Sequence, residues 1–314
     1  MSFEFIVRKY RTMNELDQLQ SFVAIARAGS ISRAARQTHM AKSVLSKRLA
    51  DLEARLGTSL ITRTTRSLSL TDSGAQFLRR AEAILDELAE AEREARGSVG
   101  ALAGKLRVAA PLSFGLAHLE PVIADFILKH PDLDVEIDFS DRQINLVEDQ
   151  IDVAVRIGDL ADSSLIARKV APIHHQVAAA PTFWERHGVP THPDDLASLD
   201  CLHYLNLARP EQLPWWGPRG TSGVVRPSIR LLASNGDFLA DLAARGCGFV
   251  AEPAFILAPL VAAGRLQPVL EDYEWAAMNL YVIFAPNRRI SAKARAFADA
   301  IIEQFSSASN PTKL

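Results

Sequence analysis

Apolar residues recur at helical spacing from Leu16 onwards, and Gly29 follows the last of them. Intervals of three and four residues place these side chains on one face of a helix, and glycine is typical of the residue that ends a helix. Residues 1–12 fit no helical or strand pattern well. Because the clear pattern begins only after Met13, the sequence leaves open whether Met1 or Met13 is the true first residue.

Two further helical patterns follow, separated by a turn. Ser32 is expected to cap a short helix over Arg33–Thr38, because a serine hydroxyl can accept a hydrogen bond from a free N–H group of the first turn. A second helix is expected over Lys42–Leu56, and Gly57 stands where a left-handed glycine commonly ends a helix. Two helices joined by so short a turn predict a helix-turn-helix.

A basic hairpin and a long helix complete this part of the chain. The segment Ser59–Thr71 is rich in threonine, isoleucine and leucine, which predicts two short strands joined by a basic tip. A helix then begins at Thr71 or Asp72 and continues to about Arg96. We therefore expect a winged helix-turn-helix domain over residues 13–71 and a linker helix over residues 72–96.

The linker helix carries a heptad pattern of apolar residues. Their spacing alternates between four and three, and they are Phe77, Ala81, Ile84, Leu88, Ala91 and Ala95. Such a seam favours pairing with another helix, most simply the same helix of a second copy, which would make a homodimer or a dimer of dimers. The alternative is that the helix packs on its own domain.

Beyond a glycine-rich hinge over residues 97–104, strand and helix patterns alternate to residue 306. Strands are expected over 106–110, 134–139, 151–157, 175–180, 229–233, 248–251 and 280–284, and helices over 114–130, 144–150, 238–245 and 292–305. This alternation predicts an α/β domain with a mainly parallel sheet and helices on both faces. The length suggests two lobes, one from about 105–172 with 279–306, the other over 173–278.

Charge is divided unevenly between the two parts. Residues 1–70 hold twelve Lys and Arg against five Asp and Glu, whereas the remainder holds 23 against 32. A basic end on an acidic body is expected when that end meets a polyanion such as DNA. No apolar run approaches the ~20 residues that span a bilayer, and no signal peptide is evident, so we expect a cytoplasmic protein.

Side chains near the helix-turn-helix are candidates for contact with double-stranded DNA. The first turns of the second helix reach base edges in the major groove in such domains, which places Lys42, Ser43 and Ser46 there. Phosphate contacts are expected from Arg33, Lys47 and Arg48, and Ser32 is a further candidate for contact with DNA. At the tip of the hairpin, Arg63 and Arg66 are placed to enter the minor groove.

Residues 13–96 resemble the DNA-binding domain and linker helix of LysR-type transcriptional regulators. The motifs are FVAIARAGSISRAARQTHMAKSVLSKRLADLEARLG and LITRTTRSLSLTDSGAQFL. The motifs LRVAAPLSFG, IDVAVRIG and ARGCGFVAEP resemble that family's effector-binding domain, which has two α/β lobes like a periplasmic binding protein. One departure is Ala41, which stands where the family often has the serine that caps the second helix; losing such a cap costs ~1 kcal/mol.

The resemblance implies a small-molecule inducer, often an organic acid, held between the lobes. Carried over by position, the effector-binding residues are Ser113, Phe114, Ser140, Asp141, Asn206, Asn235, Asp237 and Ala251. A helix N-terminus at Ser113 favours an anion, but Asp141 would repel a carboxylate, which leaves the charge of the inducer open. Ser113, Asn235 and Asp237 have the alternative roles of helix caps and turn residues.

These patterns predict a sequence-specific transcriptional regulator controlled by an inducer. An enzyme is the rival class, but no catalytic triad, Cys-His pair or glycine-rich phosphate loop supports it. A ligand sensor that does not bind DNA is disfavoured by the basic first part. The two cysteines, Cys201 and Cys247, fit neither a disulfide framework nor a metal site, and no cofactor is expected.

Overall fold

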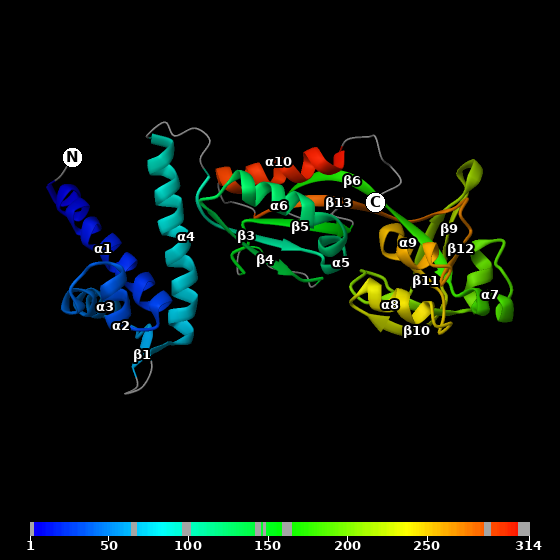
Figure 1. The fold of residues 1–314 in the computed structure, drawn as a ribbon, viewed down its shortest axis with the longest axis horizontal. Coiled ribbons are helices and arrows are strands. Elements are labelled where there is room, and N and C mark those ends of the chain that lie inside the picture. The colour runs from blue at the N-terminus through cyan, green and yellow to red at the C-terminus, as the bar shows by residue number, and fades with distance from the viewer. Residues whose placement is uncertain are drawn as a thin grey trace. The chain divides into compact units, whose positions relative to one another are not determined.

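The computed structural model describes residues 3–63, 68–95, 102–141, 146, 149–158, 165–285 and 290–306. The chain forms two compact units, residues 1–100 and residues 101–314, each of which is described by itself (Figure 1). The predicted hinge over 97–104 and the predicted helix over 144–150 lie largely outside the described residues, as do Arg66 and the side chains of Arg63 and Ala95.

The first unit contains four helices and a two-stranded sheet among its described residues. In chain order these are α1 (Phe3–Ala28), α2 (Ile31–Gln37), α3 (Lys42–Leu56), β1 (Ile61–Arg63), β2 (Leu68–Leu70) and α4 (Asp72–Ala95). The predicted bounds of α3 are confirmed, and Gly57 follows it in the left-handed region at φ 68°. β1 and β2 pair antiparallel, as the hairpin pattern predicts.

Two expectations for this unit are wrong. The first helix begins at Phe3 rather than near Leu16, because no glycine or proline interrupts the segment between Phe3 and Ala28. Ser32 does not cap the second helix. The first helical hydrogen bond runs from the Ala34 N–H to the Ser30 carbonyl, so Ser30 is the cap and Ser32 lies in the first turn.

A single hydrophobic core joins the helices of the first unit. Phe22 of α1 and Leu45 of α3 are completely buried in it. The ring of Phe77 in α4 lies 5.5 Å from that of Phe22. Gly74 allows α4 to approach closely, because a Cβ atom there would come within 1.9 Å of the Leu60 carbonyl oxygen. The start of α4 is therefore packed firmly on its own unit.

This packing divides the predicted heptad seam of α4 into two parts. Phe77 and Ala81 pack into the core of the first unit, and Ala81 is only 1% exposed. Ile84 is 53% exposed, Leu88 is half-buried and Ala91 is exposed. The first part of the seam therefore packs within its own domain, and only the later positions present apolar surface to a second helix.

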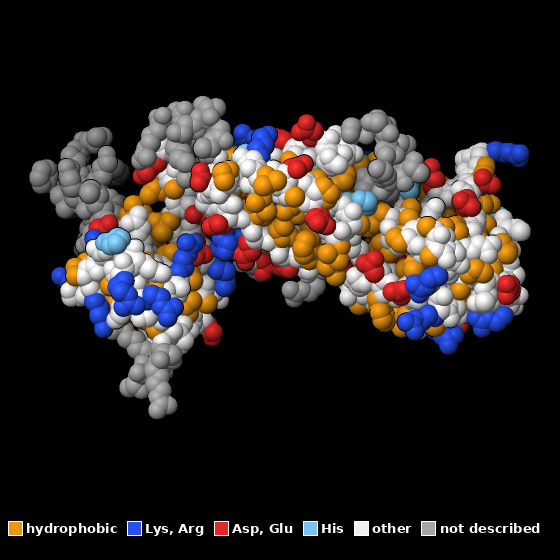
Figure 2. Space-filling model, viewed as in Figure 1, with side chains coloured by type: hydrophobic (Ala, Val, Ile, Leu, Met, Phe, Trp, Pro, Cys, Tyr) orange, Lys and Arg blue, Asp and Glu red, His pale blue; other side chains and the backbone are white. Residues whose placement is uncertain are grey.

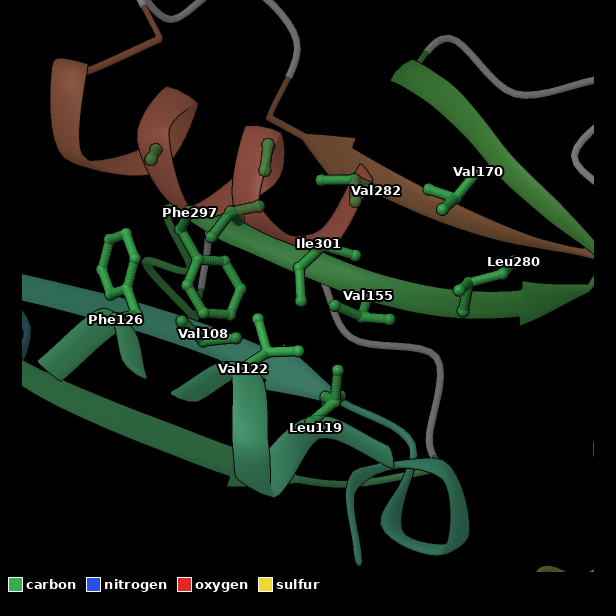
Figure 3. Close-up of a cluster of buried hydrophobic side chains, with 14 of the residues drawn as sticks. Val108, Leu119, Val122, Phe126, Val155, Val170, Leu280, Val282, Phe297 and Ile301 are labelled. Carbon is green, nitrogen blue, oxygen red and sulfur yellow. The ribbon is translucent and has the colours of Figure 1, made fainter. Parts of the chain in front are cut away.

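The second unit has two lobes that share two long strands, β6 (Ile166–Ala179) and β13 (Glu274–Phe284). The first lobe contains β3 (Gly104–Ala110), α5 (Leu112–Phe114), a π-helix (Gly115–Leu119), α6 (Glu120–Lys129), β4 (Leu133–Phe139), β5 (Val153–Gly158) and α10 (Ala292–Ser306). Helices α6 and α10 pack on one face of its sheet. Figure 3 shows Phe126, Phe297 and Ile301 converging on Val108 and Val155 of the strands.

The second lobe is built from shorter elements. They are α7 (Pro181–His187), a 3-10 helix (Pro193–Ser198), β7 (Asp200–Tyr204), β8 (Leu213–Trp216), a 3-10 turn (Pro218–Gly220), β9 (Ser222–Val225), β10 (Ser228–Ala233), α8 (Gly236–Ala243), β11 (Val250–Pro253), α9 (Ala254–Ala262) and β12 (Gln267–Val269). The sequence patterns missed α7, α9, β7, β8, β9 and β12.

The expectation of a mainly parallel sheet is wrong. The main sheet has the order β11-β6-β13-β5-β3-β4, and only the β3–β4 and β3–β5 pairs within it are parallel. β13 runs antiparallel to both β5 and β6. The physical reason is that the chain enters the second lobe along β6 and returns along β13, so these two neighbours must run in opposite directions.

Candidate functional site

The N-terminal end of α3 presents polar and basic side chains to solvent. Lys42 is the first residue of the helix, and Lys42, Ser43 and Lys47 are exposed while Ser46 is half-buried. The opposite face is anchored by three completely buried leucines, Leu45, Leu49 and Leu52. Ala41 caps the helix without any side-chain hydrogen bond. The N-terminal N–H groups and these four side chains therefore form a polar surface on a rigid support.

The helix before it adds positive charge to the same unit. Arg33 and Arg36 of α2 are exposed, and the sequence analysis did not single out Arg36. The turn to α3 passes through His39 at φ 54°, and the Met40 N–H donates to the Ala35 carbonyl at 3.1 Å. Figure 2 shows Lys and Arg side chains gathered on one face of the first unit.

Arg48 has a role that the sequence did not predict. Its guanidinium lies 2.7 Å from the Asp17 carboxylate of α1 and within 3.5 Å of the Ser21 hydroxyl. The side chain is 24% exposed. This ion pair joins α1 to α3, so Arg48 contributes to the packing of the domain and has less freedom to reach a phosphate.

The hairpin is fastened to α3 by a single carboxylate. Oε1 of Glu53 accepts hydrogen bonds from the backbone N–H groups of Leu60 at 2.8 Å and Ile61 at 3.1 Å, and from the Ser59 hydroxyl at 3.1 Å. Arg63 is the last residue of β1 and pairs with Leu68. The position of the hairpin relative to α3 is thus set by Glu53, which the sequence analysis did not identify.

In the second unit, predicted effector residues from both lobes meet. The Ser113 hydroxyl at the start of α5 donates a hydrogen bond to the Asp237 carboxylate of α8. The Leu112 N–H donates to Oδ1 of Asp141 at 3.3 Å, and the Asn206 side-chain amide donates to the Asp141 carbonyl at 2.9 Å. We call Ser113, Asp141, Asn206, Asp237 and the neighbouring Glu252 the lobe junction.

Glu252 of β11 is a buried carboxyl group that the sequence analysis passed over in favour of Ala251. It is 3% exposed, and its Oε1 has no hydrogen-bond partner among the described atoms. Burial raises its pKa to about 8, and the charges of Asp237 and Asp141 contribute to that rise. Burial also raises the pKa of Asp141. The residue types alone could not reveal this, because it depends on which elements surround β11.

Arg156 of β5 lies beside the same cluster. It donates to the Ser140 carbonyl at 3.2 Å. Burial lowers the pKa of its guanidinium, and the negative charges of Asp141 and Asp138 oppose that effect. Burial raises the pKa of Tyr204 to about 12, so this phenol stays protonated. Arg156 therefore balances part of the negative charge on the first-lobe side of the junction.

Two histidines lie on strands of this unit: His175 on β6 is half-buried, and His203 on β7 is buried. Burial lowers the pKa values of His175 and His203 to about 4, so both rings are neutral. His203 is 2% exposed, and neither of its ring nitrogens has a hydrogen-bond partner among the described atoms. Among the residues that the structure describes, no group of three His, Cys, Asp or Glu side chains is placed to hold a metal ion.

The remaining predicted effector residues are packed in hydrophobic cores or cap a helix, apart from Ser140. The Phe114 ring is completely buried in the first-lobe core, 5.8 Å from the Phe255 ring of α9, and Ala251 packs in a second-lobe core. Only their backbones could meet a ligand. Asn235 caps α8 by accepting from the Phe238 N–H at 2.9 Å, the alternative that the sequence left open. Ser140 is half-buried and follows β4.

Two family models match the chain. Residues 16–75 match the bacterial regulatory helix-turn-helix protein, lysR family, and residues 100–306 match the LysR substrate binding domain. Among curated proteins, the chain is 34% identical to the transcriptional regulator CrgA of Neisseria meningitidis, covering 92% of this chain and 96% of CrgA. It is also 34% identical to PtxR of Pseudomonas aeruginosa, covering 92% and 93%.

Solved structures agree with these matches. A structure of CrgA aligns with a TM-score of 0.55 at 33% identity, covering 92% of this chain and 98% of that one. The full-length virulence activator AphB of Vibrio cholerae aligns with a TM-score of 0.56 at 26% identity, covering 92% and 99%. No helix in the described part of this chain is both long and apolar enough to cross a membrane.

Proposed function

The chain belongs to the LysR family of DNA-binding transcriptional regulators, and on that premise we propose how its own residues perform the regulation. The first unit binds duplex DNA with the N-terminal end of α3 in the major groove. Lys42, Ser43 and Ser46 contact base edges there, and Lys42 is suited to guanine. The exposure of Lys42 and Ser43 on a helix anchored by buried leucines carries this proposal.

Contacts with the DNA backbone come from the surrounding basic residues. Exposed Arg33 and Lys47 face solvent next to the reading surface and supply phosphate contacts, as does Arg36. Arg63, the last residue of β1, and Arg66, three positions further along the sequence, are assigned to the minor groove. Ser32, in the first turn of α2, supplies a hydroxyl to a phosphate. The ion pair with Asp17 makes Arg48 the weakest of the predicted contacts.

The second unit senses a small-molecule inducer at the lobe junction. Ser113 and Asp141 come from the first lobe, and Asn206 and Asp237 from the second, so a ligand bound among them contacts both lobes. Such a ligand changes the relative populations of lobe arrangements, which is how a bound molecule alters a distant function. An organic acid gains no support from the junction, because the Leu112 N–H and the Ser113 hydroxyl already donate to carboxylates.

The active form is a homodimer or a dimer of dimers that acts in the cytoplasm, where the genomic DNA is. Ile84, Leu88 and Ala91 leave apolar surface on α4 beyond the part that packs within its own unit. Pairing this surface with a second copy covers it and brings together two copies of α3 for two half-sites. Regulation, rather than catalysis, is the function we assign.

A gel-shift titration with two variants tests the DNA surface. Lys42→Ala is expected to lose about 1–3 kcal/mol of preference for the operator over scrambled DNA. Arg55→Ala is the matched control, because Arg55 is exposed at the other end of the same helix. The DNA that flanks the gene provides the operator. If Lys42→Ala binds both DNAs as the unchanged protein does, the proposed reading surface is wrong.

A further inference from the structure

Three carboxyl groups from three different elements gather at the lobe junction. Asp141 follows β4, Asp237 lies in the first turn of α8, and Glu252 lies in β11. Asp141 and Asp237 accept hydrogen bonds from the adjacent residues Leu112 and Ser113, which places the two aspartates close together. Oε2 of Glu252 lies beside Gly236, the residue before Asp237. The junction is therefore rich in carboxyl groups, whose oxygens are hydrogen-bond acceptors and which can supply negative charge to a cationic ligand.

Three donors that could bind an anion here are already occupied. The Leu112 N–H, at the start of α5, donates to Asp141, and the Ser113 hydroxyl donates to Asp237. On the second lobe, the Phe238 N–H donates to the Asn235 side chain. A ligand carboxylate would have to displace the chain's own oxygens and would then face their negative charges.

The positive charge nearby is limited. Among the described residues, Arg156 is the one cation whose charge lowers the pKa of Asp141. In that described part of the chain, no cation offsets the raised pKa of Glu252. Arg156 also interacts with Asp138 and donates to the Ser140 carbonyl. One guanidinium shared in this way does not balance the carboxyl groups on the second-lobe side of the junction.

Glu252 supplies an independent sign of a missing partner. It is 3% exposed, and Oε1 has no hydrogen-bond partner among the described atoms. Its other oxygen faces the beginning of α8, where a Cβ atom added at Gly236 would lie 2.8 Å from Oε2. A buried carboxyl oxygen without a partner is costly, so a ligand that donates a hydrogen bond at this place would remove that cost.

We propose that the inducer of this regulator carries a positively charged, hydrogen-bond-donating group, such as a primary ammonium, which binds between Asp237, Asp141 and Glu252. This proposal rests on the proposed function, because it assigns the ligand class of the same junction. An ammonium group has three N–H donors and can satisfy three acceptors at once. Its charge also compensates the carboxylates, which a neutral or acidic ligand cannot do.

Three probes of equal chain length and different charge test the proposal on the full-length protein. They are 1,4-diaminobutane, 1,4-butanediol and succinate, compared at matched concentration and ionic strength. The readouts are the thermal midpoint of unfolding, titration calorimetry and the midpoint of a gel shift on the operator. The diamine is expected to raise the thermal midpoint and to move the gel-shift midpoint, and the other two probes are expected to do neither.

Two variants establish where the diamine binds. Asp237→Asn is expected to weaken its binding at least tenfold. Asp241→Asn is the matched control and is expected to bind as the unchanged protein does, because Asp241 lies on the same helix but pairs with Arg265 at the surface. Asp141→Asn provides a second test from the other lobe and is expected to weaken binding by a similar factor.

Three results would overturn the ligand class. They are a response to succinate in place of the diamine, an equal response of both aspartate variants and the control, and no response to any probe. Operator binding without a probe separates these results from a failure of the proposed function. If the protein binds the operator and the diamine fails, only the ligand class is wrong. If it does not bind the operator, the proposed function itself is wrong.

Discussion

The hydroxyl of Ser113 in the first lobe donates a hydrogen bond to the carboxylate of Asp237 in the second. The Asn206 amide makes a second link by donating to the Asp141 carbonyl at 2.9 Å. Because the two lobes also share β6 and β13, these polar links act in addition to a covalent connection. They are therefore suited to adjust the opening of the lobes rather than to hold the unit together.

Replacing Ser113 should loosen this connection. Ser113→Ala removes a hydrogen bond to a charged group at a partly exposed place, which we expect to cost about 1 kcal/mol. The open arrangement should then be about fivefold more populated, and amide hydrogen exchange should quicken in the first turn of α8. Ser228→Ala, at an exposed position of β10, is the control. Equal exchange in both variants would show that the bond does not restrain the lobes.

Glu53 should set the stability and position of the hairpin. Glu53→Ala leaves the N–H groups of Leu60 and Ile61 without their acceptor, and both residues are buried, so we expect to lose about 2 kcal/mol. Glu53→Gln keeps an acceptor and should lose less. All four tryptophans lie in the second unit, so far-ultraviolet circular dichroism rather than tryptophan fluorescence must follow unfolding here.

Asp51→Ala is the control for this series, because Asp51 is exposed on the same helix. The affinity for the operator should fall in Glu53→Ala and should be unchanged in Asp51→Ala. If both variants unfold at the same denaturant concentration as the unchanged protein, Glu53 is not what fastens the hairpin.

Ile84 should matter for dimerisation and not for folding. Ile84→Glu places a charge on the exposed apolar part of α4, and we expect the dimer dissociation constant to rise at least tenfold. Gln76→Glu adds the same charge at another exposed position of that helix and should leave the constant unchanged. Analytical ultracentrifugation at several protein concentrations measures the dissociation constants of both variants. An unchanged constant for Ile84→Glu would place the dimer interface elsewhere.

Glu252 should make the second unit less stable as the pH rises. Its pKa is raised from 4.5 to about 8 by burial, then by Asp237 and Asp141. A raised folded-state pKa means that the folded protein holds a proton which the unfolded chain releases above pH 4.5, so this group's contribution to stability falls between about pH 4.5 and pH 8. Burial raises the pKa values of Tyr204 and Cys201, and the charge of Glu252 adds to both increases.

Glu252→Gln tests this sign. A neutral amide does not titrate in this range. The free energy of unfolding of the variant, relative to that of the unchanged protein, should therefore rise by about 2 kcal/mol between about pH 5 and pH 7. Tryptophan fluorescence during urea unfolding follows the second unit selectively. The opposite slope is expected from His175 and His203, whose pKa values are lowered, and it is common to both proteins. A pH-independent difference would contradict the assignment.

Local patterns along the chain are enough to define the reading helix. The bounds of α3 follow from the spacing of Leu45, Leu49 and Leu52 and from the glycine after Leu56, and both are properties of neighbouring residues. The hairpin and the long helix α4 were likewise predictable from short-range patterns. The basic character of the first part and the motifs of the LysR family were visible in the same way, because they require no knowledge of distant contacts.

Long-range contacts decided the rest. Arg48 and Asp17 are 31 positions apart, and Ser113 and Asp237 are 124 apart, so no local pattern could pair them. Likewise, only the fold shows that β6 and β13 cross both lobes and that Glu252 is buried among other acids. The amino-acid sequence by itself determined the reading helix α3 and the family, because these depend on near neighbours. The tertiary structure decided the charge of the lobe junction, because electrostatic energy depends on distance and burial in space.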